Sequence, residues 1–107
     1  MYKVKVDRPL SQVDRQLRTD LREVGGMKLL GESKVVHGAT TVVTLVYERY
    51  YLRSQAKTAL MIVLVGDEES AHVTAMSGGG ETVKLFRFGT DQNIVQLVAA
   101  SLNGEML

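Results

Sequence analysis

The sequence predicts an α+β protein in which one curved antiparallel sheet of five to six strands carries two helices on one face. Three observations lead to this fold class. The first residues alternate between apolar and polar side chains, as a strand with one wet face does. Apolar residues recur every three or four positions near 10–24 and 94–102, as along one side of a helix. Between these segments, residues 27–77 are rich in β-branched and aromatic residues, which favour strands.

The first strand and the first helix follow from these patterns. Residues 2–6 alternate, and Pro9 ends the strand because proline has no N–H for a sheet ladder. The helix carries one apolar stripe, formed by Leu10, Val13, Leu17, Leu21 and Val24. Ser11 with Asp14 resembles a capping box, and Gly25-Gly26 supplies the positive φ that ends a helix.

Four further strands are expected at 27–37, 40–52, 57–65 and 71–77. Gly38-Ala39, the polar residues 53–55 and the acidic residues 66–70 connect them. A short extended piece at 82–88 then leads to a last helix that Thr90 caps. The order is strand, helix, four or five strands, helix, within one domain spanning residues 1–107.

The strand at 57–65 is apolar on both of its faces, which is the most informative feature of the sequence. Helices can cover only one face of a single sheet, so something else must cover the second face. On the next strand, the small residues at 71, 73 and 75 suit close helix packing. We therefore expect His72, Thr74 and Met76 on the open face, as part of an interface or a pocket.

Three tyrosines in "VYERYYLR" are further candidates for that interface: Tyr47, Tyr50 and Tyr51. Tyr47 and Tyr51 share one face of the strand and Tyr50 points to the other, so at least one tyrosine belongs to core or edge packing. Tyrosines beside arginines can also stack single-stranded bases. A net charge of +1 argues against nucleic acid, because binding phosphates needs a basic surface.

The glycines Gly78, Gly79 and Gly80 raise the question of a phosphate-binding loop. An extended segment follows them instead of a helix, and neither the Walker spacing nor G-x-G-x-x-G is present. Glu81 would also repel a phosphate. We therefore interpret the three glycines as a structural turn or wide bulge.

Other chemistry finds little support. The chain has no cysteine, and no serine stands in G-x-S-x-G. His37 and His72 are not at metal-ligand spacing, and the acidic cluster at 67–69 is typical of a solvated turn. No catalytic residue, metal or cofactor is predicted. The first residues contain no apolar signal sequence and no run is long enough to span a membrane, so we expect a cytoplasmic protein.

The element order resembles the half-repeat of the TATA-binding-protein fold and, more loosely, the helix-grip fold. The segment "SGGGETVKLFRF" followed by a helix is also similar to the C-terminal half of an uncharacterised family of small bacterial proteins. The latter resemblance implies no activity and no site residues.

Two functions from different classes stay open. The first is an interaction module that forms a homodimer through its open sheet face. The second is a protein that binds a small apolar ligand, in a pocket between helix and sheet or over the open face. A single-stranded nucleic-acid binder and an enzyme rank below both, because no nucleophile, base and orienting group can be assembled from the spacing.

Overall fold

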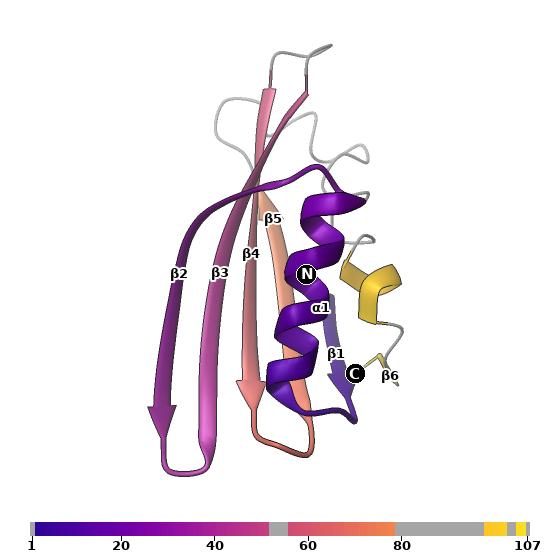
Figure 1. Cartoon of the computed structure of the whole chain (residues 1–107). Coiled ribbons are helices and arrows are strands. Elements are labelled where there is room, and N and C mark those ends of the chain that lie inside the picture. The colour runs from indigo at the N-terminus through magenta and orange to yellow at the C-terminus, as the bar shows by residue number, and fades with distance from the viewer. Residues whose placement is uncertain (1, 52–55, 79–97, 103–104, 107) are drawn as a thin grey trace.

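The computed structural model describes residues 2–51, 56–78, 98–102 and 105–106. They form one six-stranded sheet in the order β2-β3-β4-β5-β1-β6, in which every neighbouring pair is antiparallel (Figure 1). With the helices on one face, the predicted α+β class is confirmed.

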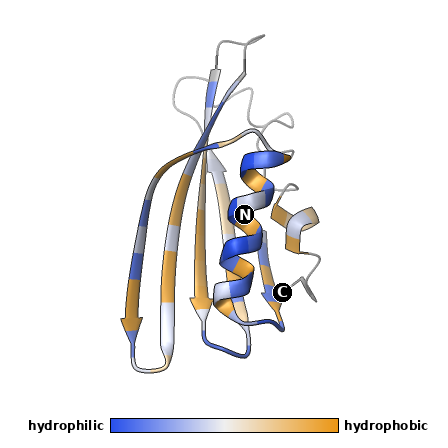
Figure 2. Cartoon of the chain, viewed as in Figure 1, coloured by the Kyte–Doolittle hydropathy of each residue, from blue (hydrophilic) through white to orange (hydrophobic). Residues whose placement is uncertain are grey.

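β1 (Tyr2–Val6) leads through Pro9 into α1 (Leu10–Glu23). The apolar stripe of α1 is buried against the sheet at Leu10, Val13, Leu17 and Leu21. The opposite side of the helix is hydrophilic (Figure 2). Gly26, with a φ of 61°, turns the chain after the helix, as the pair of glycines predicts.

The predicted capping box at the start of α1 is wrong. Pro9 occupies the cap position and no side chain caps the helix. The first amide, that of Leu10, instead donates to the backbone carbonyl of Asp67 over 2.9 Å. The loop between two later strands therefore satisfies a helix end that the sequence assigned to a local side chain.

The remaining strands form a meander whose bounds lie within one or two residues of those expected. They are β2 (Lys28–His37), β3 (Thr40–Tyr51), β4 (Ala56–Gly66) and β5 (Ala71–Gly78). The two-residue strand β6 (Glu105–Met106) pairs with β1. The expected extended piece at 82–88 and the start of the last helix lie outside the described residues.

A single cluster of buried hydrophobic residues lies between the sheet and the helices. The strands contribute alternate residues to it, as in the set Val43, Leu45 and Tyr47 on β3 or Leu60, Ile62 and Leu64 on β4. The helical residues 98–102 add Val98 and Leu102.

Polar contacts fix this short helical segment beside α1. Ser101 Oγ donates to Asp20 Oδ2 over 2.6 Å, and Arg8 Nη2 donates to the carbonyl of Leu102 over 2.9 Å. The end of the chain is thus tied to residues near its beginning, and both helical segments lie on the same face of the sheet.

Candidate functional site

The face of the sheet opposite α1 carries three cross-strand rows of side chains, which we call the open face. The register places these residues opposite one another along each row: Val35, Val42, Val65 and His72; Ser33, Thr44, Val63 and Thr74; Gly31, Val46, Met61 and Met76. Seven of the twelve positions are valine or methionine, so the middle of the open face is apolar over β3, β4 and β5.

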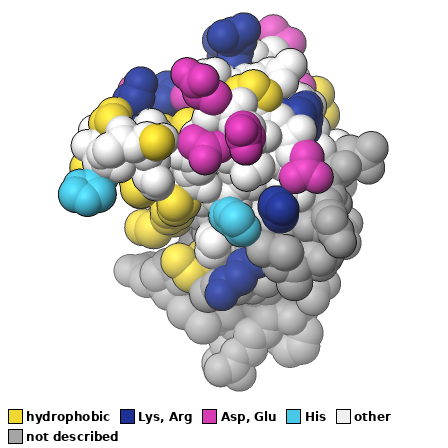
Figure 3. All heavy atoms as spheres, turned by 90° about the horizontal axis from the view of Figure 1, so that it is seen from below, with side chains coloured by type: hydrophobic (Ala, Val, Ile, Leu, Met, Phe, Trp, Pro, Cys, Tyr) yellow, Lys and Arg dark blue, Asp and Glu magenta, His cyan; other side chains and the backbone are white. Residues whose placement is uncertain are grey.

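Four of these seven apolar side chains are exposed, and the other three are half-buried. Met61 on β4 is 41% exposed, Val65 is 37% exposed and Met76 on β5 is 38% exposed. Their neighbours on β4 that point to the helices, Leu60 and Ile62, are fully buried. Figure 3 shows hydrophobic side chains gathered between the two histidines, His37 at the β2–β3 turn and His72 on β5.

The alternation along β5 places the predicted candidates on this face. His72 and Met76 are exposed and Thr74 is half-buried, whereas Ala71, Val73 and Ala75 are buried beneath the helices. His72 lies between Val65 of β4 and Lys5 of β1 in its row.

Tyr47 and Tyr50 lie on opposite faces of the sheet. Tyr50 is 49% exposed and belongs to the end of β3 opposite Lys57. Tyr47, also a candidate for the interface, is the tyrosine that belongs to core packing: its side chain is 2% exposed, between Leu29 and Leu60 on the helix side. Tyr47 shares the parity of Val43 and Leu45, and burial raises the pKa of its phenol. The side chain of Tyr51 lies outside the described part of the structure.

Of the three candidate turn glycines, Gly78 is the last residue of β5 and lies opposite Ala59. A side chain at Gly78 would meet nothing within 4 Å. Gly79 and Gly80 fall outside the described residues, so the turn itself stays a prediction.

A groove of about 1020 Å³ lies on the opposite side of the sheet, between α1 and the β2–β3 hairpin. Its lining mixes cations with anions: Arg15, Arg18, Lys34, Asp14 and the acidic loop 67–69. The lining of this groove therefore carries charges of both signs and differs from the apolar pocket that the sequence suggested.

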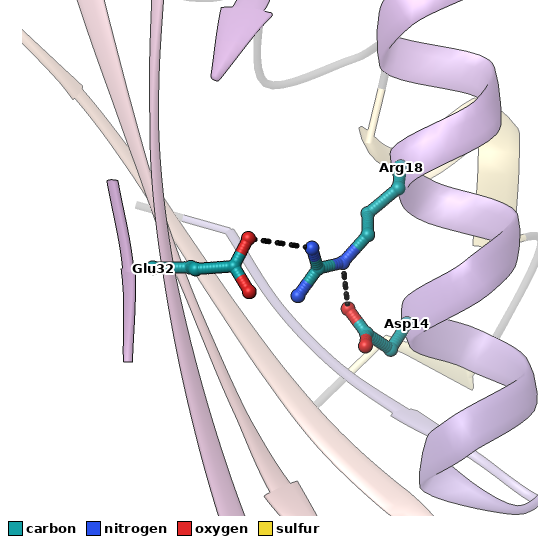
Figure 4. Close-up of polar contacts among 3 residues, drawn as sticks. All are labelled: Asp14, Arg18 and Glu32. Carbon is teal, nitrogen blue, oxygen red and sulfur yellow. Dashed lines mark hydrogen bonds and ion pairs between the residues drawn. The ribbon is translucent and has the colours of Figure 1, made fainter. Parts of the chain in front are cut away.

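Arg18 joins the two walls of this region (Figure 4). Its Nε donates to Asp14 Oδ1 and its Nη1 donates to Glu32 Oε2, each over 2.8 Å. These bonds, that of Asp14 first, raise the pKa of the Arg18 guanidinium above its ordinary value. The sequence analysis missed this group, although the four-residue spacing of Asp14 and Arg18 on one helix was a signal for it.

The acidic loop is organised by Asp67. Its Oδ1 accepts from the amides of Glu69 and Ser70, over 2.8 and 3.1 Å, and these bonds lower the pKa of the carboxyl. Within residues 2–51, 56–78 and 98–102, no three acidic or histidine side chains lie close enough together to hold a metal ion. The carboxylate of Asp67 therefore accepts hydrogen bonds from its own loop and stabilises the conformation of that loop.

The fold and the open face define a class of protein: a small α+β protein with one sheet face covered by helices and the other apolar and accessible. The chain belongs to a family of unknown function, DUF6054, whose model matches residues 1–105. No curated protein and no solved structure matches the chain. The expected bacterial origin and the likeness to the TATA-binding-protein fold stay predictions.

No helix in the described part of the chain is long and apolar enough to cross a membrane. The cytoplasmic location expected from the sequence is a prediction that this observation does not address.

Proposed function

We propose that this protein is an interaction module that binds a second copy of itself through the open face. The observation that carries the proposal is the exposure of Met61, Val65 and Met76 in the middle of the sheet. Residues at a sheet edge or in a loop are often exposed singly without consequence. Here Met61 and Met76 lie opposite each other on adjacent strands, and Val65 lies on the same face of β4, which favours a binding surface.

The energetics permit such a dimer. Removing apolar surface from water stabilises by about 25 cal/mol per Å², so covering several hundred Å² contributes on the order of 10 kcal/mol. Association costs about 4–15 kcal/mol, so the fit between the two faces decides the affinity. Met61 and Met76, which lie opposite each other, have flexible side chains that adapt to a facing surface.

The polar residues around the apolar rows suit the rim of an interface. Lys3 and Lys5 border the open face on β1, and Glu48 lies opposite Lys28 at the end of β2. Two such faces would pack with their sheets about 10 Å apart, as in a β-sandwich, and leave the helices outside. A two-fold axis is the commonest way to close such a pair.

Sedimentation velocity between 1 and 100 µM tests the proposal, with those concentrations chosen as roughly the range of a moderate dimer. The wild-type chain should sediment as a dimer or a larger species, and Met61→Lys should stay folded and sediment at a lower mass than the wild type, because it places a charge in the open-face interface. Val24→Lys is the matched control: Val24 is 75% exposed at the end of α1, away from the open face, and the dimer should persist.

A wild-type monomer at every concentration would overturn the proposal. Native mass spectrometry of the same sample then separates the remaining occupants. A monomer that carries extra mass indicates the alternative function, binding of a small apolar ligand. A monomer of the bare chain mass indicates that residues of the chain itself cover the face.

A further inference from the structure

β2 is the outermost strand of the sheet, and no described element lies beyond it (Figure 1). Every residue of β2 except the half-buried Leu29 is exposed. An uncovered edge of ten residues presents a row of backbone N–H and C=O groups that another strand can bind. The question is which strand fits this edge.

The β2–β3 turn determines which residues of β2 direct their backbone groups outward. His37 and Thr40 flank the two-residue loop of Gly38, with a φ of 62°, and Ala39. The bond that closes such a turn makes the flanking residues a hydrogen-bonded pair. Because hydrogen-bonded and non-hydrogen-bonded pairs alternate, the outward groups belong to the even-numbered residues 32, 34 and 36.

The side chains along this edge are self-complementary. Glu32 lies opposite Leu45 and Lys34 lies opposite Val43, so the two charges are on the helix side of the sheet. If a second β2 runs antiparallel with Ser33 at the two-fold axis, Glu32 of each copy faces Lys34 of the other. Moving the axis by one residue sets Glu32 against Glu32, or Lys34 against Lys34, which repel.

We propose that β2 pairs edge to edge with β2 of a second copy of this chain, in the register centred on Ser33. The same register brings Leu30, the extra residue at the bulge of β2, close to Val36 of the second copy. These two residues are 51% and 63% exposed, so the pairing gives a partner to apolar side chains that the chain leaves in water. The ladder would extend the sheet without a break across both copies.

The contacts already made by Glu32 are compatible with this pairing. Arg18 occupies Oε2 of Glu32, and a carboxylate has a second oxygen that can accept from a lysine of the other copy. Within the described residues Lys34 has no ion-pair partner. The edge contact uses β2, whereas the proposed face contact centres on β3, β4 and β5, so either can exist without the other.

A single cysteine tests the register. The chain has no cysteine, so Ser33→Cys adds only one thiol. Ser33 would face its own copy in a non-hydrogen-bonded pair, where the Cα atoms are about 4.5 Å apart and within the range of a disulfide. We expect Ser33→Cys to form a disulfide-linked dimer under mild oxidation, in more than about half of the chains.

Val35→Cys is the matched control, because Val35 points to the same face of the same strand. In the proposed register residue 35 faces Gly31 of the second copy, and the two thiols are about 14 Å apart along the strands. Val35→Cys should therefore run as a monomer on a non-reducing denaturing gel. Equal cross-linking of both variants, or none of Ser33→Cys, would overturn the inference.

A charge exchange tests the pairing independently of any disulfide. In a homodimer of Glu32→Lys, lysine faces lysine, and in a homodimer of Lys34→Glu, glutamate faces glutamate, so each variant repels a second copy of itself. In a heterodimer of the two variants, every lysine faces a glutamate, and the attractive pairs are restored. Each variant alone should self-associate about tenfold more weakly than the parent, whereas the mixture should form heterodimers close to parental strength. Native mass spectrometry distinguishes the species by mass, and a statistical mixture of homodimers and heterodimers would contradict the inference.

Both charge variants are prepared with Met61→Lys, and the parent is Met61→Lys alone, so contact through the open face does not contribute. A heterodimer in this background supports the edge pairing whether or not the open face associates. If Met61→Lys does not change the association of the chain, but Ser33→Cys still forms a disulfide-linked dimer, then only the edge contact exists.

Discussion

Arg18 on α1 donates from Nη1 to Oε2 of Glu32 on β2 over 2.8 Å, and so connects the helix to the edge strand of the sheet. Arg18 also bonds Asp14 on its own helix, which holds the guanidinium in place. The chain thereby links an exposed strand to the element that covers the core (Figure 4).

Arg18→Met should loosen this connection. Because the groups are partly exposed, we expect the free energy of unfolding to fall by only about 0.5–1 kcal/mol. Backbone amides of β2 should exchange with deuterium faster, since the strand loses its tie to the helix. Arg15→Met removes a cation that lines the same groove and serves as the control. Equal exchange in both variants would show that the ion pair does not hold β2.

Asp67 should contribute a stability that depends on pH. Hydrogen bonds from the amides of Glu69 and Ser70 lower the pKa of its carboxyl below the ordinary value of 3.8. The stabilisation is therefore present above that value and is lost as the pH falls through the lower pKa of the folded state. Asp67→Asn keeps an acceptor for both amides but does not titrate.

Urea unfolding at pH values from 2 to 7, roughly the range in which carboxylates titrate, measures this effect. The free energy of unfolding of Asp67→Asn should fall less steeply in acid than that of the wild-type chain. Glu68→Gln, on the same exposed loop, should follow the wild-type curve. If the two variants change the curve equally, the local hydrogen bonds of Asp67 are not its cause.

Thr58 should be replaceable by valine without loss. Its hydroxyl is buried near the start of β4, on the face of the sheet that the helices cover, and has no hydrogen-bond partner in the described structure. A buried polar group without a partner costs about 1–3 kcal/mol. Thr58→Val keeps the shape and should leave the free energy of unfolding unchanged or raise it by about 1 kcal/mol. Thermal unfolding of Thr58→Val is the measurement, and Thr41→Val serves as the control. If Thr58→Val is markedly destabilised and Thr41→Val is not, this account is wrong.

Gly66 allows β4 and the β4–β5 loop to approach closely. A Cβ atom there would lie 2.2 Å from the carbonyl oxygen of Ser70 and 2.7 Å from Cα of Ala71, and both are backbone atoms. Gly66→Ala should therefore lower the free energy of unfolding by about 1–3 kcal/mol. Gly78→Ala, at a site with open space, should change it by less than about 0.5 kcal/mol. Similar values from denaturant titration would mean that the loop relaxes around the new methyl group.

Local patterns were sufficient to predict most of the fold. The alternation along β1 and β5 and the apolar stripe on α1 predict which side chains are buried. Such periodic patterns arise because only one face of each element is buried. The double-sided apolar pattern of β4 likewise predicted an accessible apolar face, and Met61 and Val65 lie on it.

The parts that the sequence did not predict depend on contacts between distant residues. Parity separates Tyr47 from Tyr50 but does not tell which of them lies beneath the helices; the pairing of Tyr47 with Leu60 decides that. Leu30 is an extra residue at a bulge between Leu29 and Gly31, so alternation counted from the start of β2 fails before it reaches Glu32. The Arg18–Glu32 contact was hidden for that reason.

The central claim, that the open face binds a second copy, is tested most directly by methyl NMR on an equimolar mixture of protein labelled only at methionine methyl groups and unlabelled protein. We predict contacts from the methyl groups of Met61 and Met76 across the subunit boundary, and none from Met27, which is buried in the core and serves as an internal control. Contacts of Met61 and Met76 with protons of their own chain alone, at concentrations where the protein sediments as one species, would contradict the claim.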